Sequence, residues 1–136
     1  MSKSFAKVLT KNDSGESGAH QGGICVPKKN SKLVQFFPPL DPSEENPSTW
    51  IHCTTESGEV IKMRYVYYNN KIHKKGTRNE YRITYMTKFF KAYNAKSGDS
   101  VVFSKLDEEG CYKIEIQKAT SPKPGVIMLR GWNEIH

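Results

Sequence analysis

Short apolar segments separated by polar loops recur along the whole chain, and this spacing constrains the fold more than any other feature. Each segment has the length, or the alternation of apolar and polar residues, that is typical of a β-strand. Seven strands are predicted in this way, at residues 5–9, 24–26, 50–54, 60–68, 82–85, 100–106 and 111–117. Strands of this length, with long polar loops between them, are typical of a small closed or half-closed barrel.

Only two short helices are predicted between these strands. The first covers residues 31–37 and ends at Pro38, because proline cannot continue a helix. The second begins with Thr87 as its N-cap and carries an apolar stripe formed by Met86, Phe89, Phe90 and Tyr93. A doubly wound parallel sheet would need several more helices, so the predicted fold class is mainly β with two short helices.

The 136 residues suffice for one domain, with a predicted core at about 5–118 and a tail at 119–136. No apolar run is long enough to span a membrane, and the N-terminus lacks the apolar core of a signal peptide. The three cysteines are far apart and form no Cys-x-x-Cys pair, which disfavours a structural zinc site. These features predict a cytoplasmic protein without a membrane partner.

Positive charge is concentrated in one part of the chain. The sequence contains 21 Lys and Arg against 14 Asp and Glu, a net charge of +7. Residues 62–96 contain ten basic residues and one acidic residue, Glu80, so this segment alone carries +9. Residues 40–61, in contrast, contain five acidic residues and no lysine or arginine. Such a concentrated field suits binding to a polyanion, although a basic surface can also serve solubility alone.

Within the basic segment, residues 77–82 read Thr-Arg-Asn-Glu-Tyr-Arg. If this stretch is extended, Arg78, Glu80 and Arg82 project from the same side of the chain. Arginine can donate two hydrogen bonds to O6 and N7 of guanine, and glutamate can accept one from N4 of cytosine. The row would then read G and C bases in the major groove of DNA. The alternative is an exposed ion-pair ladder within the chain, which contributes little to stability.

Two weaker features are compatible with nucleic-acid binding. A glycine-rich loop at 12–23 contains His20 and Gln21, which could reach base edges, but it lacks the Gly-Lys-Ser/Thr of a phosphate-binding loop. Six of the seven tyrosines lie within 62–96 and could stack on unpaired bases. Tyrosine also suits half-buried strands, and we expect Tyr65 and Tyr93 in the core. A module for single-stranded DNA or RNA is therefore a weaker alternative.

The sequence shows no convincing catalytic site. A small, self-contained metal-dependent nuclease is the main alternative function, using Glu59 with Lys62 or Glu115 with Lys118. Two residues intervene in each pair, so on a strand the lysine would point to the opposite face from the glutamate. The four histidines show no spacing typical of metal ligands. We therefore expect that these residues do not form an enzyme by themselves.

Two separated motifs resemble the N-terminal, effector-binding domain of the EcoRII restriction endonuclease family. One is NDSGESGAHQ at residues 12–21, and the other is TRNEYRIT at 77–84, preceded by Tyr67, Tyr68 and Asn69. The resemblance extends in the same order over about 5–118 and includes Asn-Pro-Ser at 46–48. It implies a DNA-binding pseudobarrel, the fold shared with plant auxin-response transcription factors, in which two arms grip the major groove.

The resemblance also implies a function: the effector and target-recognition domain of a type IIE-like bacterial restriction endonuclease that binds the sequence CCWGG or a close variant. The residues expected to read bases are His20, Arg78, Glu80 and Arg82. Supporting or phosphate contacts are expected from Gln21, Asn69, Lys71, Lys74, Lys75, Asn79 and Tyr81. Binding to double-stranded DNA would need no cofactor, and magnesium would serve only a separate nuclease domain on a longer chain. Tyr81 and Cys25 depart from the family's pattern.

Overall fold

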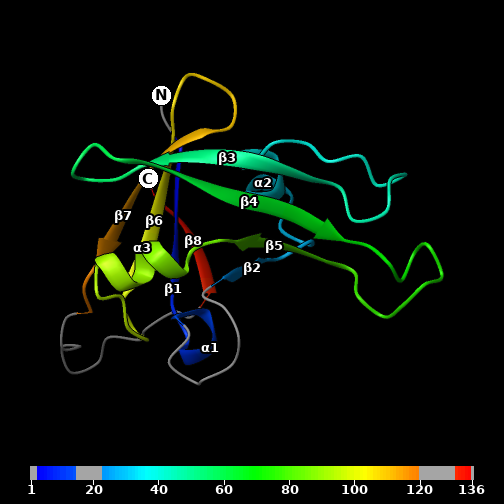
Figure 1. Ribbon diagram of the computed structural model, residues 1–136, viewed down its shortest axis with the longest axis horizontal. Helices are drawn as coiled ribbons and strands as arrows, with labels where there is room; N and C mark the ends of the chain where they lie inside the picture. The colour runs from blue at the N-terminus through cyan, green and yellow to red at the C-terminus, as the bar shows by residue number, and fades with distance from the viewer. Residues whose placement is uncertain (1–2, 15–22, 120–130, 136) are drawn as a thin grey trace.

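The computed structural model describes residues 3–14, 23–119 and 131–135. Its eight strands form a single curled sheet (Figure 1). The order across the sheet is β2-β5-β4-β3-β7-β6-β1-β8. Neighbouring strands are antiparallel except β3 and β7, which run parallel. The strands are β1 (Ser4–Val8), β2 (Ile24–Val26), β3 (Ser48–Thr54), β4 (Val60–Tyr68), β5 (Glu80–Thr84), β6 (Ser100–Lys105), β7 (Cys111–Gln117) and β8 (Gly131–Ile135). The prediction of a mainly β, half-closed barrel is confirmed.

Both predicted helices are present, as α2 (Ser31–Phe36) and α3 (Thr87–Ala92). The side chain of Asn30 caps α2 by accepting a hydrogen bond from the N–H of Leu33 at 3.1 Å. The predicted N-cap of α3 is wrong by one residue, because the buried Met86 occupies that position and offers no side-chain cap. A further single turn, α1 (Lys11–Ser14), was not predicted. No helix in the described parts of the chain is long and apolar enough to cross a membrane.

The structure contains one strand, β8, in addition to the seven that the sequence predicts. It pairs with β1 along its whole length, in the region 119–136 that was expected to be a tail. Its sequence, GWNEI, has no regular alternation of apolar and polar residues, so the usual strand signal is missing. Trp132 nevertheless packs against the core and donates a hydrogen bond to the carbonyl oxygen of Cys25 in β2 at 2.8 Å. This side chain joins the two edge strands of the curled sheet.

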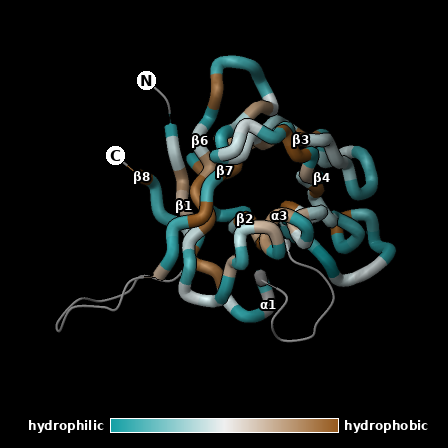
Figure 2. The backbone as a smooth tube through the Cα atoms, turned by 60° about the vertical axis from the view of Figure 1, so that its left-hand side comes forward, coloured by the Kyte–Doolittle hydropathy of each residue, from teal (hydrophilic) through white to brown (hydrophobic). Residues whose placement is uncertain are grey.

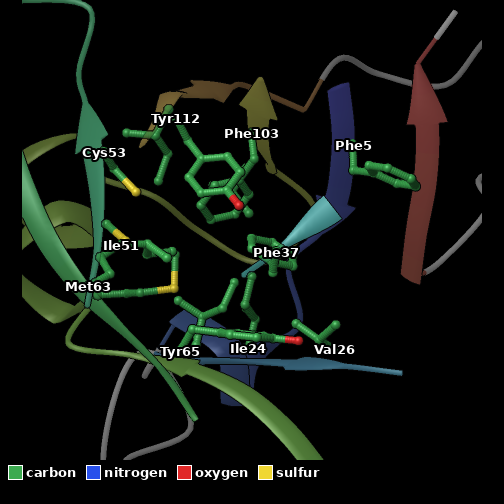
Figure 3. Packing of buried hydrophobic residues seen from close by; sticks show 14 of the residues in the cluster. Phe5, Ile24, Val26, Phe37, Ile51, Cys53, Met63, Tyr65, Phe103 and Tyr112 are labelled. Atoms are coloured by element: carbon green, nitrogen blue, oxygen red, sulfur yellow. The ribbon is translucent and has the colours of Figure 1, made fainter. Parts of the chain in front are cut away.

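The core lies inside the curl, where side chains from opposite strands point toward one another (Figure 3). Phe37, which follows α2, lies at its centre, with its ring centroid 5.0 Å from that of Tyr65 and 5.4 Å from that of Tyr112. Figure 2 shows the strands around this core and hydrophilic loops outside it. Tyr65 is fully buried, as predicted, and Tyr93 packs against the edge of the core.

Candidate nucleic-acid interface

The loop between β4 and β5, residues 69–79, projects from one end of the sheet and is called the basic arm here (Figure 1). Its two sides are joined by hydrogen bonds from Lys71 N–H to the carbonyl oxygen of Arg78 and from Lys75 N–H to that of Asn70, both at 2.9 Å. The amide oxygen of Asn70 accepts a further bond from Arg78 N–H at 2.7 Å. A Cβ atom at Gly76 would lie 2.7 Å from the Asn70 amide nitrogen, so any larger residue would displace the Asn70 side chain that bonds Arg78 N–H.

The base of the basic arm is held by Asn69, whose side chain is completely buried. Its amide oxygen accepts a hydrogen bond from Asn46 N–H at 2.7 Å, while the side-chain oxygen of Asn46 accepts one from Asn69 N–H at 3.1 Å. The amide nitrogen of Asn69 donates to the carbonyl oxygens of Pro42 and Glu44. Asn69 therefore positions the basic arm from within and is not accessible to a ligand.

The acidic segment that had no role in the sequence analysis supports the same arm. Lys75 forms an ion pair with Glu45 at 2.9 Å, and a ring nitrogen of His73 lies 3.1 Å from the carbonyl oxygen of Pro42. Both contacts are exposed, so each adds little stability. Together with the buried Asn69 they fix the arm against the loop that precedes β3.

Arg78, Glu80 and Arg82 lie in a row on the outer face of β5 and the end of the basic arm. Arg78 donates from Nη2 and Nε to Oε1 of Glu80 at 2.7 and 3.1 Å, and Nη1 of Arg82 lies 3.8 Å from Oε2 of the same carboxylate. The three side chains are 30–45% exposed. The alternation predicted from the sequence is therefore confirmed, and the ion-pair ladder of the alternative interpretation is present as well.

The ladder and a base-reading role are compatible on energetic grounds. Exposed ion pairs contribute about 0–1 kcal/mol, so a ligand that offers equivalent hydrogen bonds can replace them at little cost. The guanidinium carbon of Arg78 also lies 3.8 Å from the ring centroid of Tyr68, which is opposite Glu80 in the β4–β5 register. This cation–π contact fixes the plane of the guanidinium group while leaving its outer edge accessible.

The residues between the charged side chains point to the opposite face of the strand. Tyr81 stacks on Tyr67 with centroids 4.3 Å apart and on Tyr65 at 5.7 Å. The Tyr67 hydroxyl donates a hydrogen bond to the side-chain oxygen of Asn79. Partial burial raises the pKa of Tyr81, with a smaller contribution from Tyr67. Tyr81 and Asn79 thus support the row from beneath, as part of the packing between β4 and β5.

The strand β2 completes the outer face on the other side of β5. Cys25 lies directly opposite Arg82, and burial together with the negative charge of Glu80 raises the pKa of the Cys25 thiol. Gly23, just before β2, approaches β5 so closely that a Cβ atom there would lie 2.9 Å from the carbonyl oxygen of Ile83. This approach brings the start of β2 directly beside the end of β5.

A buried ion pair holds the other end of the glycine-rich loop. Nζ of Lys7 lies 2.8 Å from Oδ2 of Asp13, and both residues are 8% exposed. The carbonyl oxygen of Asp13 accepts a hydrogen bond from Gly23 N–H at 3.2 Å. Removing one partner of such a pair would leave an uncompensated buried charge. The predicted base-reading His20 and its neighbour Gln21 lie outside the described residues.

The remaining predicted residues are on the surface of the basic arm. Lys71 and Lys74 are exposed, and within the described residues neither forms an ion pair. Of the tyrosines considered for base stacking, only Tyr85 is a largely exposed residue. The supporting roles of Asn46, Lys7 and Trp132 were not predicted. Asn46 and Trp132 have partners that are distant in the sequence, and the partner of Lys7, Asp13, lies six residues away, beyond the end of β1.

The two residue pairs considered for a nuclease site have other surroundings. Lys118 binds the carboxylate of Asp99 at 3.1 Å and also the carbonyl oxygen of Asn94. Glu115 faces Val102 across the β6–β7 ladder, while Glu59 and Lys62 are exposed near the β3–β4 turn. Among the described residues, no three histidine, cysteine, aspartate or glutamate side chains are grouped as metal ligands.

The eight-stranded, half-open barrel is a pseudobarrel, and the basic arm extends from its β4–β5 ribbon. A chain from the Arabidopsis FUS3–DNA complex has this fold, with a TM-score of 0.62 over 85% of this chain and 96% of that chain, at 19% identity. The chain belongs to the family described as restriction endonuclease EcoRII, N-terminal, which it matches over residues 2–118.

Sequence identity supports the same assignment. The chain is 31% identical over 119 residues to the type II restriction enzyme EcoRII of Escherichia coli. The match covers 82% of this chain but only 29% of that enzyme. The chain therefore corresponds to less than a third of the length of its relative.

Proposed function

We propose that the chain binds duplex DNA with the outer face of β5 and the basic arm, and that Arg78, Glu80 and Arg82 read bases in the major groove. The observation that carries the proposal is the row itself. Two hydrogen-bond donors, Arg78 and Arg82, flank one acceptor, Glu80, and all three side chains are partly exposed on one face. A two-stranded antiparallel ribbon fits the major groove, and β4 with β5 forms such a ribbon. Guanine O6 and N7 suit the arginines, and cytosine N4 suits the glutamate.

The exposed lysines give the non-specific part of the binding energy. Lys71, Lys74 and Lys75 lie on the arm beside the row, where they can neutralise phosphates on both sides of the groove. His20 and Gln21 would contact bases from the glycine-rich loop, the second arm. Asn69, Asn79 and Tyr81 hold the reading residues in place from within.

The relatives support a more specific role. One structural neighbour was solved as a complex with DNA, and the chain belongs to the family of the EcoRII N-terminal region. We propose that the chain is the effector and target-recognition domain of a bacterial, cytoplasmic restriction enzyme of the type IIE kind. Its target would be CCWGG or a close variant, which contains both bases that the row can read. Cleavage, and the magnesium it needs, would belong to a nuclease domain elsewhere on a longer chain.

The test is a fluorescence titration of a short CCWGG duplex against a scrambled duplex at two salt concentrations. Preference for the CCWGG duplex should persist at the higher salt, because hydrogen bonds to bases depend less on counterion release than phosphate contacts do. Equal binding that collapses with salt would refute base reading and leave only a phosphate-binding surface. A single-stranded probe should bind more weakly than the duplex, and plasmid incubated with the chain and Mg²⁺ should remain intact.

A further inference from the structure

Two large aromatic side chains are exposed on the same outer surface, away from the basic arm. Trp50 in β3 is 46% exposed, and Tyr85, which follows β5, is 60% exposed. Their rings stack with centroids 5.1 Å apart and an angle of 30° between the planes. A stacked aromatic pair that is left in solvent has large apolar faces available for a ligand.

The backbone at Tyr85 adopts an unfavourable conformation that places the ring in this stack. Ile83 points into the core and Thr84 lies on the outer face, so regular alternation would turn Tyr85 inward. Its φ of 64° lies in the left-handed region, which costs a tyrosine about 1 kcal/mol relative to glycine. The turn reverses the alternation and brings the ring over Trp50.

This aromatic pair is continuous with the reading row. Trp50 lies opposite Arg64 on β4, and Arg64 lies opposite Thr84 on β5, two residues after Arg82. The outer face thus runs without a break from Arg82 to Trp50. Tyr85 follows Arg82 by three residues, about 10 Å along an extended chain, which corresponds to about three base-pair steps of B-form DNA.

The charge around the aromatic pair favours a polyanion on the side that faces β5. Arg64 and Lys62 extend from β4, and within the part of the chain described neither has a partner in an ion pair. Acidic residues mark the outer limits of the surface: Glu56 and Glu59 lie at the β3–β4 turn, and three acidic residues lie at 107–109, beyond β3. A duplex extending from the reading row would therefore meet positive charge up to Trp50 and repulsion beyond it.

We propose that Trp50, Tyr85 and Arg64, together called the Trp50 patch, bind the sugar–phosphate backbone of duplex DNA about three base pairs beyond the bases read by the row. The aromatic rings pack against deoxyribose, and Arg64 pairs with a phosphate. This inference rests on the proposed function, but it concerns the DNA that flanks the target and is independent of the target sequence. The patch thus lengthens the footprint of the domain on one side.

The experiment compares duplexes with flanks of about six base pairs on each side with duplexes trimmed to about one, in CCWGG and scrambled sequence. Trp50→Ala and Tyr85→Gly should each weaken binding to both long duplexes about fivefold, because the rings lose apolar contact area, and should leave the short duplexes unaffected. Arg64→Gln should lower the slope of log affinity against log salt by about one for the long duplexes. Matched controls are Leu106→Ala, which removes an exposed apolar side chain, and Lys113→Gln, which removes an exposed charge; neither should change binding.

Tyr85→Gly separates binding from folding. Glycine relieves the left-handed conformation, so the unfolding temperature should stay equal or rise while affinity for long duplexes falls. A lower unfolding temperature with unchanged affinity would assign the ring a structural role and overturn the inference. Equal loss on short and long duplexes would overturn it too, since the contact would then not be in the flank.

Arg82→Ala distinguishes this inference from the proposed function. If the patch variants bind all duplexes like the wild type while Arg82→Ala loses discrimination, the inference fails and the proposed function stands. If the wild-type chain binds none of the four duplexes, the proposed function fails and the inference with it.

Discussion

Trp132 donates its indole N–H to the carbonyl oxygen of Cys25 at 2.8 Å, across a sequence separation of 107 residues. The bond links β8 to β2, the two edges of the sheet, by a side chain in place of a backbone ladder. Cys25 is opposite Arg82, so the contact lies on the strand next to β5. The last described strand is thereby coupled to the candidate DNA-binding face.

Replacing Trp132 by phenylalanine should destabilise the domain by about 1–3 kcal/mol, because the Cys25 carbonyl loses its partner at a partly buried position. Urea unfolding measures this cost. Trp50→Phe serves as the control, since this tryptophan is exposed and its replacement should change stability by less than about 0.5 kcal/mol. Equal effects of the two substitutions would show that the bond between β8 and β2 does not contribute to stability.

Replacing Arg82 by alanine should cost about 1–3 kcal/mol in binding to the cognate duplex and reduce discrimination between sequences. Lys71→Ala should instead weaken binding to all duplexes alike and lower the salt slope by about one. Both effects are measured by titration at several salt concentrations. Wild-type affinity and selectivity in Arg82→Ala would show that Arg82 does not read a base.

Replacing Asn69 by alanine should lower the free energy of unfolding by about 3 kcal/mol, since it removes a buried amide that satisfies Asn46 and two carbonyl oxygens. Faster hydrogen exchange within 70–79 should accompany the loss, because the basic arm is no longer fixed at its base. Gln117→Ala removes an exposed amide and should change neither quantity. An unaltered exchange pattern in Asn69→Ala would contradict the positioning role.

Acidification should reduce stability through Asp99. Burial acts to raise the pKa of this carboxyl, but hydrogen bonds from Ala119 N–H, Lys96 N–H and Lys118 outweigh it and lower the pKa below 3.8. Because the folded-state pKa is the lower one, the stabilisation is fully present above the ordinary pKa and is lost as the pH falls through the folded value. Urea unfolding at pH 6 down to about 2 should show the loss.

An Asp99→Asn variant should lose less stability on acidification, because it cannot take up the proton. Asp107→Asn, in the exposed β6–β7 turn, is the control and should retain the wild-type profile. A wild-type profile in Asp99→Asn would assign the acid sensitivity to other carboxylates.

The sequence by itself determined the features that depend on neighbouring residues. Alternation along a strand placed Arg78, Glu80 and Arg82 on one face, and the preference of tyrosine for half-buried strands placed Tyr65 in the core. Helical spacing of the apolar residues identified α3. These are local rules, which act over a few residues whatever the rest of the chain does.

The tertiary structure alone decided which distant residues meet. Asn46 with Asn69 and Trp132 with Cys25 each depend on strand order and register, which no local pattern specifies. The stack of Trp50 on Tyr85 needed, in addition, a left-handed residue after β5. The row of charged side chains follows from the alternation along one strand. The contacts that hold the basic arm, the bond between β8 and β2 and the stacked aromatic pair follow from how the sheet curls upon itself.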